Sequence, residues 1–166
     1  MIRPLFIARG ALLCALASGA ACHHGRAKDI APPATPDSLS GTVSVTGSSL
    51  EQRLVLRSGD VAVYLSASPA DAAALERVSG VQVQVRGRAD STLFRVVNFT
   101  VIRVDGAPAL DGVLRTDGSV LAIETRNGRV VLGNPPPALR AMIGARVWIT
   151  GPAATGPLGY GVIVAP

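Results

Sequence analysis

Residues 80–87 read Gly-Val-Gln-Val-Gln-Val-Arg-Gly, and residues 144–151 read Gly-Ala-Arg-Val-Trp-Ile-Thr-Gly. In both segments apolar and polar side chains alternate between two glycines, a pattern typical of a β-strand with one buried face. We therefore predict a strand in each segment, with every second side chain in a hydrophobic core. The side chains that this alternation directs inward are Val81, Val83, Val85, Ala145, Val147 and Ile149.

The same order of features surrounds both segments, so the chain is predicted to contain one pattern twice. Each copy has three strand-like runs, then a proline that opens a short helical segment, then two more strand-like runs. The second and third runs meet at dipeptides suited to tight hairpins, Ser58-Gly59 and Asn127-Gly128. The first copy has strands at 39–45, 53–57, 61–65, 81–87 and 94–104 with a helix at 69–78; the second has strands at 110–114, 120–125, 129–132, 145–151 and 160–164 with a helix at 135–142.

This order of elements resembles the OB-fold, a five-stranded Greek-key barrel, over residues 39–166. In its repeated Gly-x-x-Val-x-Val-x-Gly strand the chain also resembles small exported bacterial OB-like domains whose function is unknown. The resemblance implies a mainly β protein with two tandem OB-like barrels, 39–105 and 110–166, each with one short helix between its third and fourth strands. A single β-sandwich built from both halves is the alternative fold.

The first 21 residues are predicted to be a bacterial signal peptide. Arg3 and Arg9 precede and flank a short apolar run, and the small residues 18–21 lead to Cys22. Cysteine after small residues resembles the lipobox of bacterial lipoproteins, which implies that Cys22 is lipidated. Gly19 departs from that motif, because Leu or Val is usual there. Ordinary cleavage after residue 20 or 21, which would release a soluble periplasmic protein, is therefore the alternative.

Residues 22–38 are predicted to be a disordered tether, because they are polar and contain three prolines. After cleavage Cys22 would be the last cysteine of the chain and would lack a disulfide partner, which favours lipidation. We therefore expect an exported protein held at a membrane of the cell envelope by its N-terminal lipid. Cys22, His23 and His24 could also bind zinc or copper, but lipidation would consume the thiol, and we predict no metal site.

The folded part offers little catalytic chemistry, so we expect no enzyme and no cofactor. Residues 39–166 contain no histidine, cysteine or lysine, which excludes nucleophilic triads and Schiff-base chemistry there. Paired carboxylates remain available for acid–base work. Asp105 and Asp117 each precede a glycine in ordinary turn sequences, and Asp111 lies beside Gly112 at the entry of a strand, which favours structural roles.

The charge of the chain does not favour nucleic-acid binding. The formal net charge is +5, but Arg3 and Arg9 leave with the signal peptide, so 14 basic residues remain against 11 acidic ones. Arginines are spread over both copies, and aromatic side chains are sparse. OB-folds that bind single strands use a basic groove with stacked aromatic rings, and neither feature is present in the sequence.

Three residues are candidates for a binding surface. Trp148 replaces Gln84 on the outward face of the repeated strand, beside Arg146, and Tyr64 falls outside the apolar alternation of its own strand. An outward tryptophan beside an arginine can anchor a ligand or partner, or it can pack on the other copy or on the tether. We expect a non-catalytic binding or interaction module that contacts an envelope protein or a small ligand. The alternative is a soluble periplasmic protein that binds a small solute or cation between the two copies.

Overall fold

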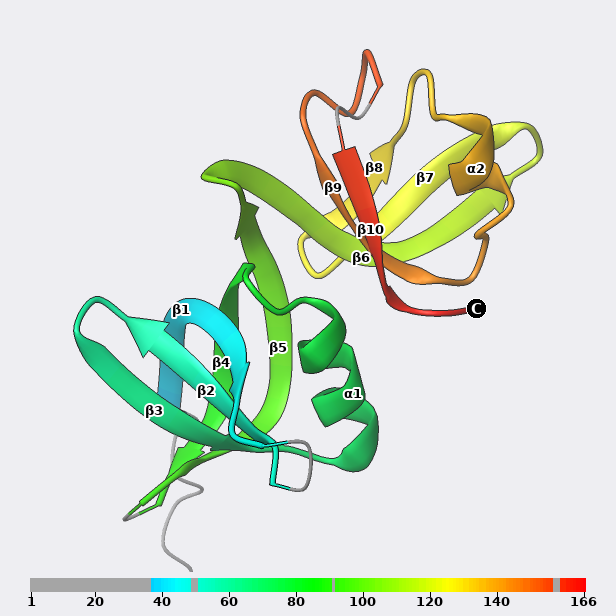
Figure 1. Cartoon of the computed structure of the whole chain (residues 1–166). Coiled ribbons are helices and arrows are strands. Elements are labelled where there is room, and N and C mark those ends of the chain that lie inside the picture. The colour runs from blue at the N-terminus through cyan, green and yellow to red at the C-terminus, as the bar shows by residue number, and fades with distance from the viewer. Residues whose placement is uncertain (1–36, 49–50, 91, 157–158) are drawn as a thin grey trace, which may run out of the picture. The chain divides into compact units, whose positions relative to one another are not determined.

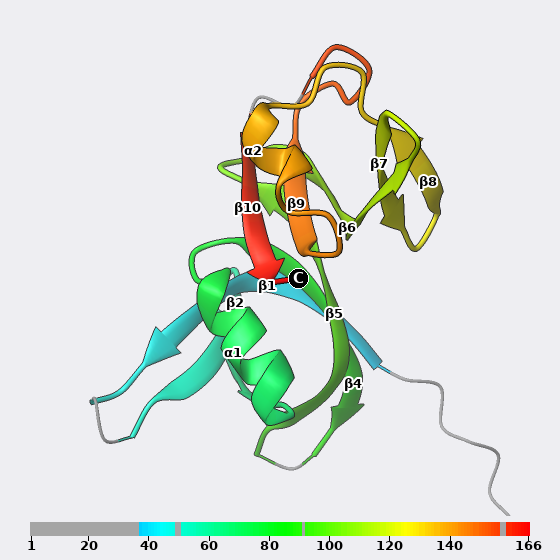
Figure 2. The ribbon, with the colours of Figure 1, turned by 90° about the vertical axis from the view of Figure 1, so that its right-hand side faces the viewer.

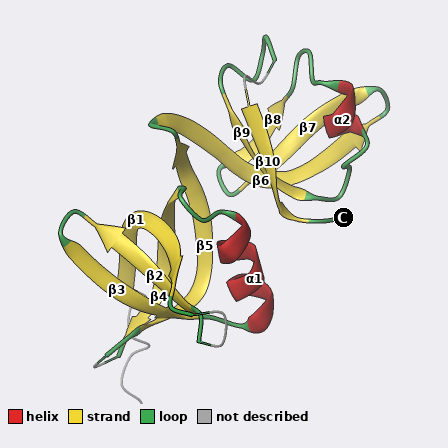
Figure 3. Cartoon of the chain, in the orientation of Figure 1, coloured by secondary structure: helices red, strands yellow, loops and turns green. Residues whose placement is uncertain are grey.

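The computed structural model describes residues 37–48, 51–90, 92–156 and 159–166. The predicted signal peptide, Cys22 and the tether up to residue 36 lie outside these ranges. Residues 35–166 form one compact unit. The described residues are mainly β, with two short helices, as Figures 1 and 3 show. The prediction of a mainly β protein is therefore confirmed.

The first half of the described chain contains five strands and one helix. Helix α1 begins where the Ser68 hydroxyl accepts a hydrogen bond from the Asp71 backbone N–H, with Pro69 in its first turn. Gly80 follows the helix with φ at 87°, a conformation that favours glycine. In chain order the elements are β1 Asp37–Thr46, β2 Arg53–Ser58, β3 Val61–Ser66, α1 Pro69–Arg77, β4 Gln82–Ala89 and β5 Phe94–Val104.

The second half has the same order of elements but a shorter helix. Helix α2 begins after Pro136 without a side-chain cap, and Gly144 follows with φ at 93°. The elements are β6 Ala107–Asp117, β7 Val120–Thr125, β8 Gly128–Val131, α2 Pro137–Arg140, β9 Arg146–Thr150 and β10 Gly159–Val164.

Strand pairing in the first half returns to its starting strand. β1 pairs with β2, β2 with β3, and β3 with β5 in parallel; β5 then pairs with β4, and β4 pairs back with β1. The parallel contact is short, joining Leu65 to Phe94 and Ser66 to Arg95. Every strand of this half therefore has two neighbours.

Pairing in the second half follows the order β8–β7–β6–β9–β10 and does not return. Among the residues described, β8 and β10 are not paired with each other. The turn Asp105-Gly106, where both φ angles are positive at 49° and 78°, connects β5 to β6. Such a turn matches the twist of a tight hairpin. Because β5 pairs with β6 across this turn, the two halves share one continuous sheet.

Two predicted boundaries are wrong for the same reason, which is that backbone pairing extends the strands. β1 begins at Asp37, so residues 37 and 38 belong to a strand that pairs with β4 and not to the tether. β6 begins at Ala107, so residues 107–109 form strand where a linker was expected. The connection between the halves is a hairpin turn.

Matching backbone contacts recur in the two halves. The Gly80 N–H donates to the Val43 carbonyl, and the Gly144 N–H donates to the Leu114 carbonyl, at 2.8 and 2.9 Å. Both contacts connect the end of a helix to the first strand of its half. The chain after each helix is thereby fixed beside the same strand position.

The inward side chains of β4 and β9 were predicted correctly. Val83, Val85, Ala145, Val147 and Ile149 are fully buried, and Val81 is half-buried against the first core. The buried residues form two clusters, one for each half.

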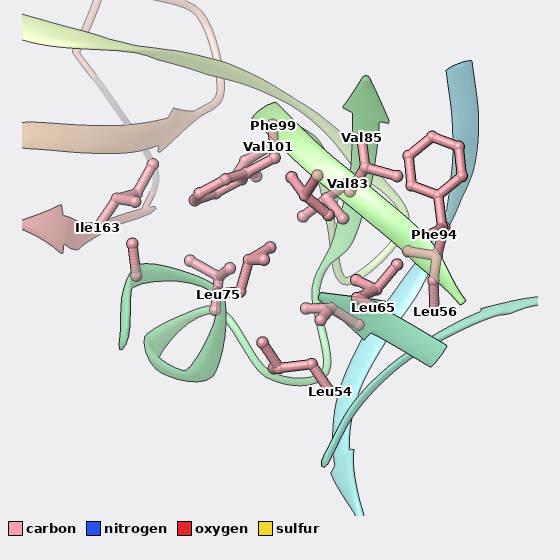
Figure 4. Packing of buried hydrophobic residues seen from close by; sticks show 14 residues of the cluster. Leu54, Leu56, Leu65, Leu75, Val83, Val85, Phe94, Phe99, Val101 and Ile163 are labelled. Atoms are coloured by element: carbon pink, nitrogen blue, oxygen red, sulfur yellow. The ribbon is translucent and has the colours of Figure 1, made fainter. Parts of the chain in front are cut away.

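Ile163 joins the two halves, because it lies on β10 but belongs to the cluster of the first half, where Figure 4 shows it with Leu75 and Phe99. The pairing of β10 with β9 is irregular between Val162 and Val164, and such an irregularity can turn a side chain toward the other face. Figures 1 and 2 show β10 ending beside α1. The Arg77 guanidinium of α1 donates to the Ile163 carbonyl at 3.1 Å.

Candidate functional site

Arg146, a predicted binding residue, holds a bidentate ion pair with Asp111. Its Nε donates to Oδ1 at 2.8 Å, and its Nη2 donates to Oδ2 at 2.7 Å. The same Nη2 donates to the Phe99 carbonyl, and the guanidinium carbon lies 4.4 Å from the centre of the Phe99 ring. Arg146 is therefore committed to contacts that join β9 to β5.

Asp111 completes this contact from β6. Its side chain is only 3% exposed, and its Oδ2 also accepts a hydrogen bond from the Val101 backbone N–H at 2.7 Å. A buried carboxylate is stable only where charge and hydrogen bonds compensate its lost hydration. Arg146 and Val101 supply both, so Asp111 connects the two halves through side chain and backbone.

Sequence reasoning placed Asp111 at the entry of a strand, where the structure has β6, but missed its ion pair with Arg146. The signal for this ion pair was weak. Asp111 of β6 lies directly opposite Trp148 of β9, and β9 is the strand that also carries Arg146. Only the pairing of β6 with β9 brings the carboxylate and the guanidinium together.

Trp148 is half-buried and packs against the hydrophobic cluster of the first half. It also lines a hollow of about 540 Å³ beside the β5–β6 turn. Gly161 faces the ring from β10, where an added Cβ would lie 2.5 Å from Trp148 Cε2. These contacts correspond to the alternative in which Trp148 packs on the other copy of the pattern.

Tyr64 lies elsewhere, on β3, with its side chain half-exposed. It lines a hollow of about 570 Å³ whose apolar floor includes Leu54 and Leu65. The guanidinium carbon of Arg53 stands 5.9 Å from the centre of the Tyr64 ring. The polar groups around the hollow are Gln52, Arg53, Ser66, Glu76 and Thr92.

Tyr64 shares none of the hollows that Trp148 or Arg146 line. The structure thus brings Trp148 and Arg146 together on β9 and separates Tyr64 from them. The hollow at Tyr64, named here the Tyr64 hollow, is comparable in volume to a second, two-part groove at the junction of the halves, whose parts measure about 280 and 270 Å³.

Within the described ranges no group of three or more histidine, cysteine, aspartate or glutamate side chains is placed to hold a metal ion. In the same part of the chain, no helix has the length and apolar character needed to cross a membrane. Cys22 lies outside these ranges, so the prediction of its lipidation stays a prediction.

No family model, no curated protein and no solved structure matches this chain.

Proposed function

We propose that the chain is an exported, lipid-anchored binding module of the cell envelope, built from two tandem OB-like barrels, and that it is not an enzyme. The observation that carries the proposal is the position of the Tyr64 hollow. OB-folds bind their ligands on the face of strands 2 and 3 and on the loops between strands 1 and 2 and between strands 4 and 5. Part of the lining of the Tyr64 hollow comes from those places, namely Gln52, Arg53, Tyr64, Ser66, Thr92 and Leu93, and part comes from α1, namely Ala72 and Glu76.

The strand pairing supports the OB-like part of this proposal. The closed pairing of the first half, with its parallel contact between β3 and β5, has the connectivity of a five-stranded Greek-key barrel. The second half has the same antiparallel pairs and lacks the closing contact among its described residues. We therefore propose a closed barrel followed by an opened one.

The Tyr64 hollow has the chemistry of a recognition surface. An apolar floor gives affinity, a half-exposed aromatic ring offers contact area, and the polar rim fixes orientation. Arg53 and Glu76 give the rim both charges. This mixture suits an uncharged or mixed-charge partner, and we propose an envelope protein.

A photoreactive residue in place of Tyr64 tests this surface in cells. We expect a specific adduct with an envelope protein, and we expect the adduct to weaken in an Arg53→Ala background. The matched control is a photoreactive residue at Val97, which is 64% exposed on β5 and lines none of the described hollows. Absence of an adduct at position 64, or identical adducts at both positions, would refute the proposed surface.

The anchor is tested separately by fractionating cells that produce Cys22→Ala. Because a thioether-linked lipid requires the cysteine, we expect the variant to leave the membrane fraction, while Cys14→Ala stays membrane-bound. A Cys22→Ala protein that remains membrane-bound would contradict lipidation and favour another mode of attachment.

The second candidate function, binding of a small solute between the two copies, is favoured by the polar groove at their junction. This groove contains three arginines, Arg86, Arg126 and Arg146. Asp111 and Glu124 line it as well, so the arginines exceed the carboxylates by one. This net positive charge opposes a cation, and we retain a solute and drop the cation from this alternative.

A further inference from the structure

A single polar groove runs along the junction of the two halves. Its two parts, about 280 and 270 Å³, share four lining residues and are therefore continuous. It is lined by β4 and β5 of the first half, and by β6, the end of β7 with the turn that follows it, and Arg146 of β9 in the second half. The four shared residues are Thr100, Asp111, Thr125 and Arg126.

The acidic residues of the groove already have partners. Asp111 pairs with Arg146 at 2.7 Å, and Glu124 pairs with Arg115 at 3.3 Å. Both carboxylates are therefore compensated within the protein.

Two arginines of the groove have no such compensation. Arg86 from β4 and Arg126 from the β7–β8 turn both line it, and neither guanidinium has an ion pair or a hydrogen bond among the described residues. Three arginines and the carboxylates of Asp111 and Glu124 line the groove; with Arg115, which pairs with Glu124 from outside the lining, two guanidinium charges remain uncompensated, one from each half. Such an excess attracts an anion.

The neutral groups beside these arginines are hydrogen-bond donors. The Thr100 hydroxyl and the amides of Gln84 and Asn127 line the same part of the groove. A guanidinium presents a planar fork of donors that matches a carboxylate or a phosphate group. Two guanidinium groups and neutral donors in one groove suit an anion that has oxygen atoms on more than one side.

We propose that this groove binds a small doubly charged oxyanion, a phosphate group or a dicarboxylate, between Arg86 and Arg126. The inference rests on the second function proposed above and names its ligand class. The volume of each part leaves room for the anion with a short body. Because the two arginines come from different halves, the bound anion also joins the halves and stabilises the folded protein by mass action.

The test is calorimetric titration of the full-length protein in detergent, at low ionic strength, with inorganic phosphate and, separately, with succinate. We expect saturable binding of at least one anion, with a matching rise in the thermal unfolding midpoint. Phosphate binding alone would identify phosphate groups as the ligand chemistry, and succinate binding alone would identify dicarboxylates. Absence of heat and of thermal shift with both anions would overturn the proposal.

Variants locate the site. Arg86→Gln and Arg126→Gln should each weaken the affinity about tenfold, the effect of losing one charge-assisted contact, and the double variant should abolish binding. The controls are Arg57→Gln in the first half and Arg129→Gln in the second, both exposed and outside the groove. Equal losses in the controls, or binding that survives the double variant, would show non-specific attraction and overturn the proposed site.

The two proposed sites fail independently. The double variant Arg86→Gln/Arg126→Gln should leave the Tyr64 adduct unchanged, because none of its residues lines the Tyr64 hollow. An adduct without anion binding would refute only the groove, and anion binding without an adduct would refute only the Tyr64 surface.

Discussion

The two halves of the molecule have the same order of elements but use their last strands differently. In the first half β5 pairs with β3 and β4, so the strand pairing closes on itself. In the second half β10 pairs with β9, and its Ile163 side chain enters the core of the first half. The same pattern of residues therefore gives one self-contained half and one half that depends on its neighbour.

The difference shows that similar sequences can take different places in a fold when their tertiary contacts differ. The last strand of the second half contacts α1 through the Ile163 side chain and carbonyl, the latter bound by Arg77. The ion pair of Asp111 and Arg146 adds a polar contact at the same junction. Two predictions measure how far the second half depends on these contacts, and a third compares the helices of the two halves.

The largest effect is expected for Asp111→Ala. The substitution leaves the Val101 N–H without its acceptor and Arg146 without its counter-ion, so the free energy of unfolding should fall by about 4 kcal/mol. Urea unfolding, followed by the emission of Trp148, the sole tryptophan of the chain, measures the change.

The control for this substitution is Asp117→Ala, which removes an exposed pair with Arg129 at 3.5 Å. This substitution should lower the free energy of unfolding by about 0.5 kcal/mol, because exposed ion pairs contribute little. Similar costs for the two substitutions would mean that the junction pair is no more important than a surface pair.

Ile163→Ala should cost about 3 kcal/mol, since it empties a fully buried site in the core of the first half. Val164→Ala next to it is the matched control, because that side chain is 42% exposed and should cost less than about 1 kcal/mol. Denaturant unfolding gives both values. If Ile163→Ala is as mild as its neighbour, β10 does not depend on the first core, and the contrast between the halves is lost.

The smallest effect is expected at the start of α1, which has a side-chain cap that α2 lacks. Ser68→Ala removes the side-chain cap of α1, a hydrogen bond of 3.1 Å, and should cost about 1 kcal/mol. The cap also includes the Ser68 hydroxyl donating to Asp71 Oδ2 at 2.7 Å. Thermal unfolding monitored by circular dichroism reports the change. Ser79→Ala, at an exposed position after the helix, is the control, and equal effects would contradict a capping role.

Much of the strand pattern was predictable, because it depends on the spacing of residues that are close together in the sequence. A strand with one buried face repeats every second residue, so Val83, Val85, Val147 and Ile149 could be placed in a core from their spacing alone. Proline and glycine marked the start and the end of α1 in the same way. The extent of β1 and β6 was missed, because pairing with a distant strand extends a segment beyond its own alternation.

The candidate sites were only partly predictable. The sequence singled out Tyr64, Trp148 and Arg146 by their departure from alternation, but it could not tell an exposed side chain from one packed on a neighbour. Trp148 packs on the first core and Arg146 is paired with Asp111, whereas Tyr64 stays half-exposed beside a hollow. The groove between Arg86 and Arg126 gave no signal at all, since these residues lie far apart in the chain.

The sequence by itself determined the mainly β class, the order of the elements and the inward side chains, because each follows from the spacing of neighbouring residues. Only the tertiary structure decided which strands close, where Ile163 points and which arginines keep their charge uncompensated. Those outcomes depend on contacts between residues far apart in the chain. These contacts form only when β5, β6, β9 and β10 come together in the fold, so no pattern of neighbouring residues predicts them.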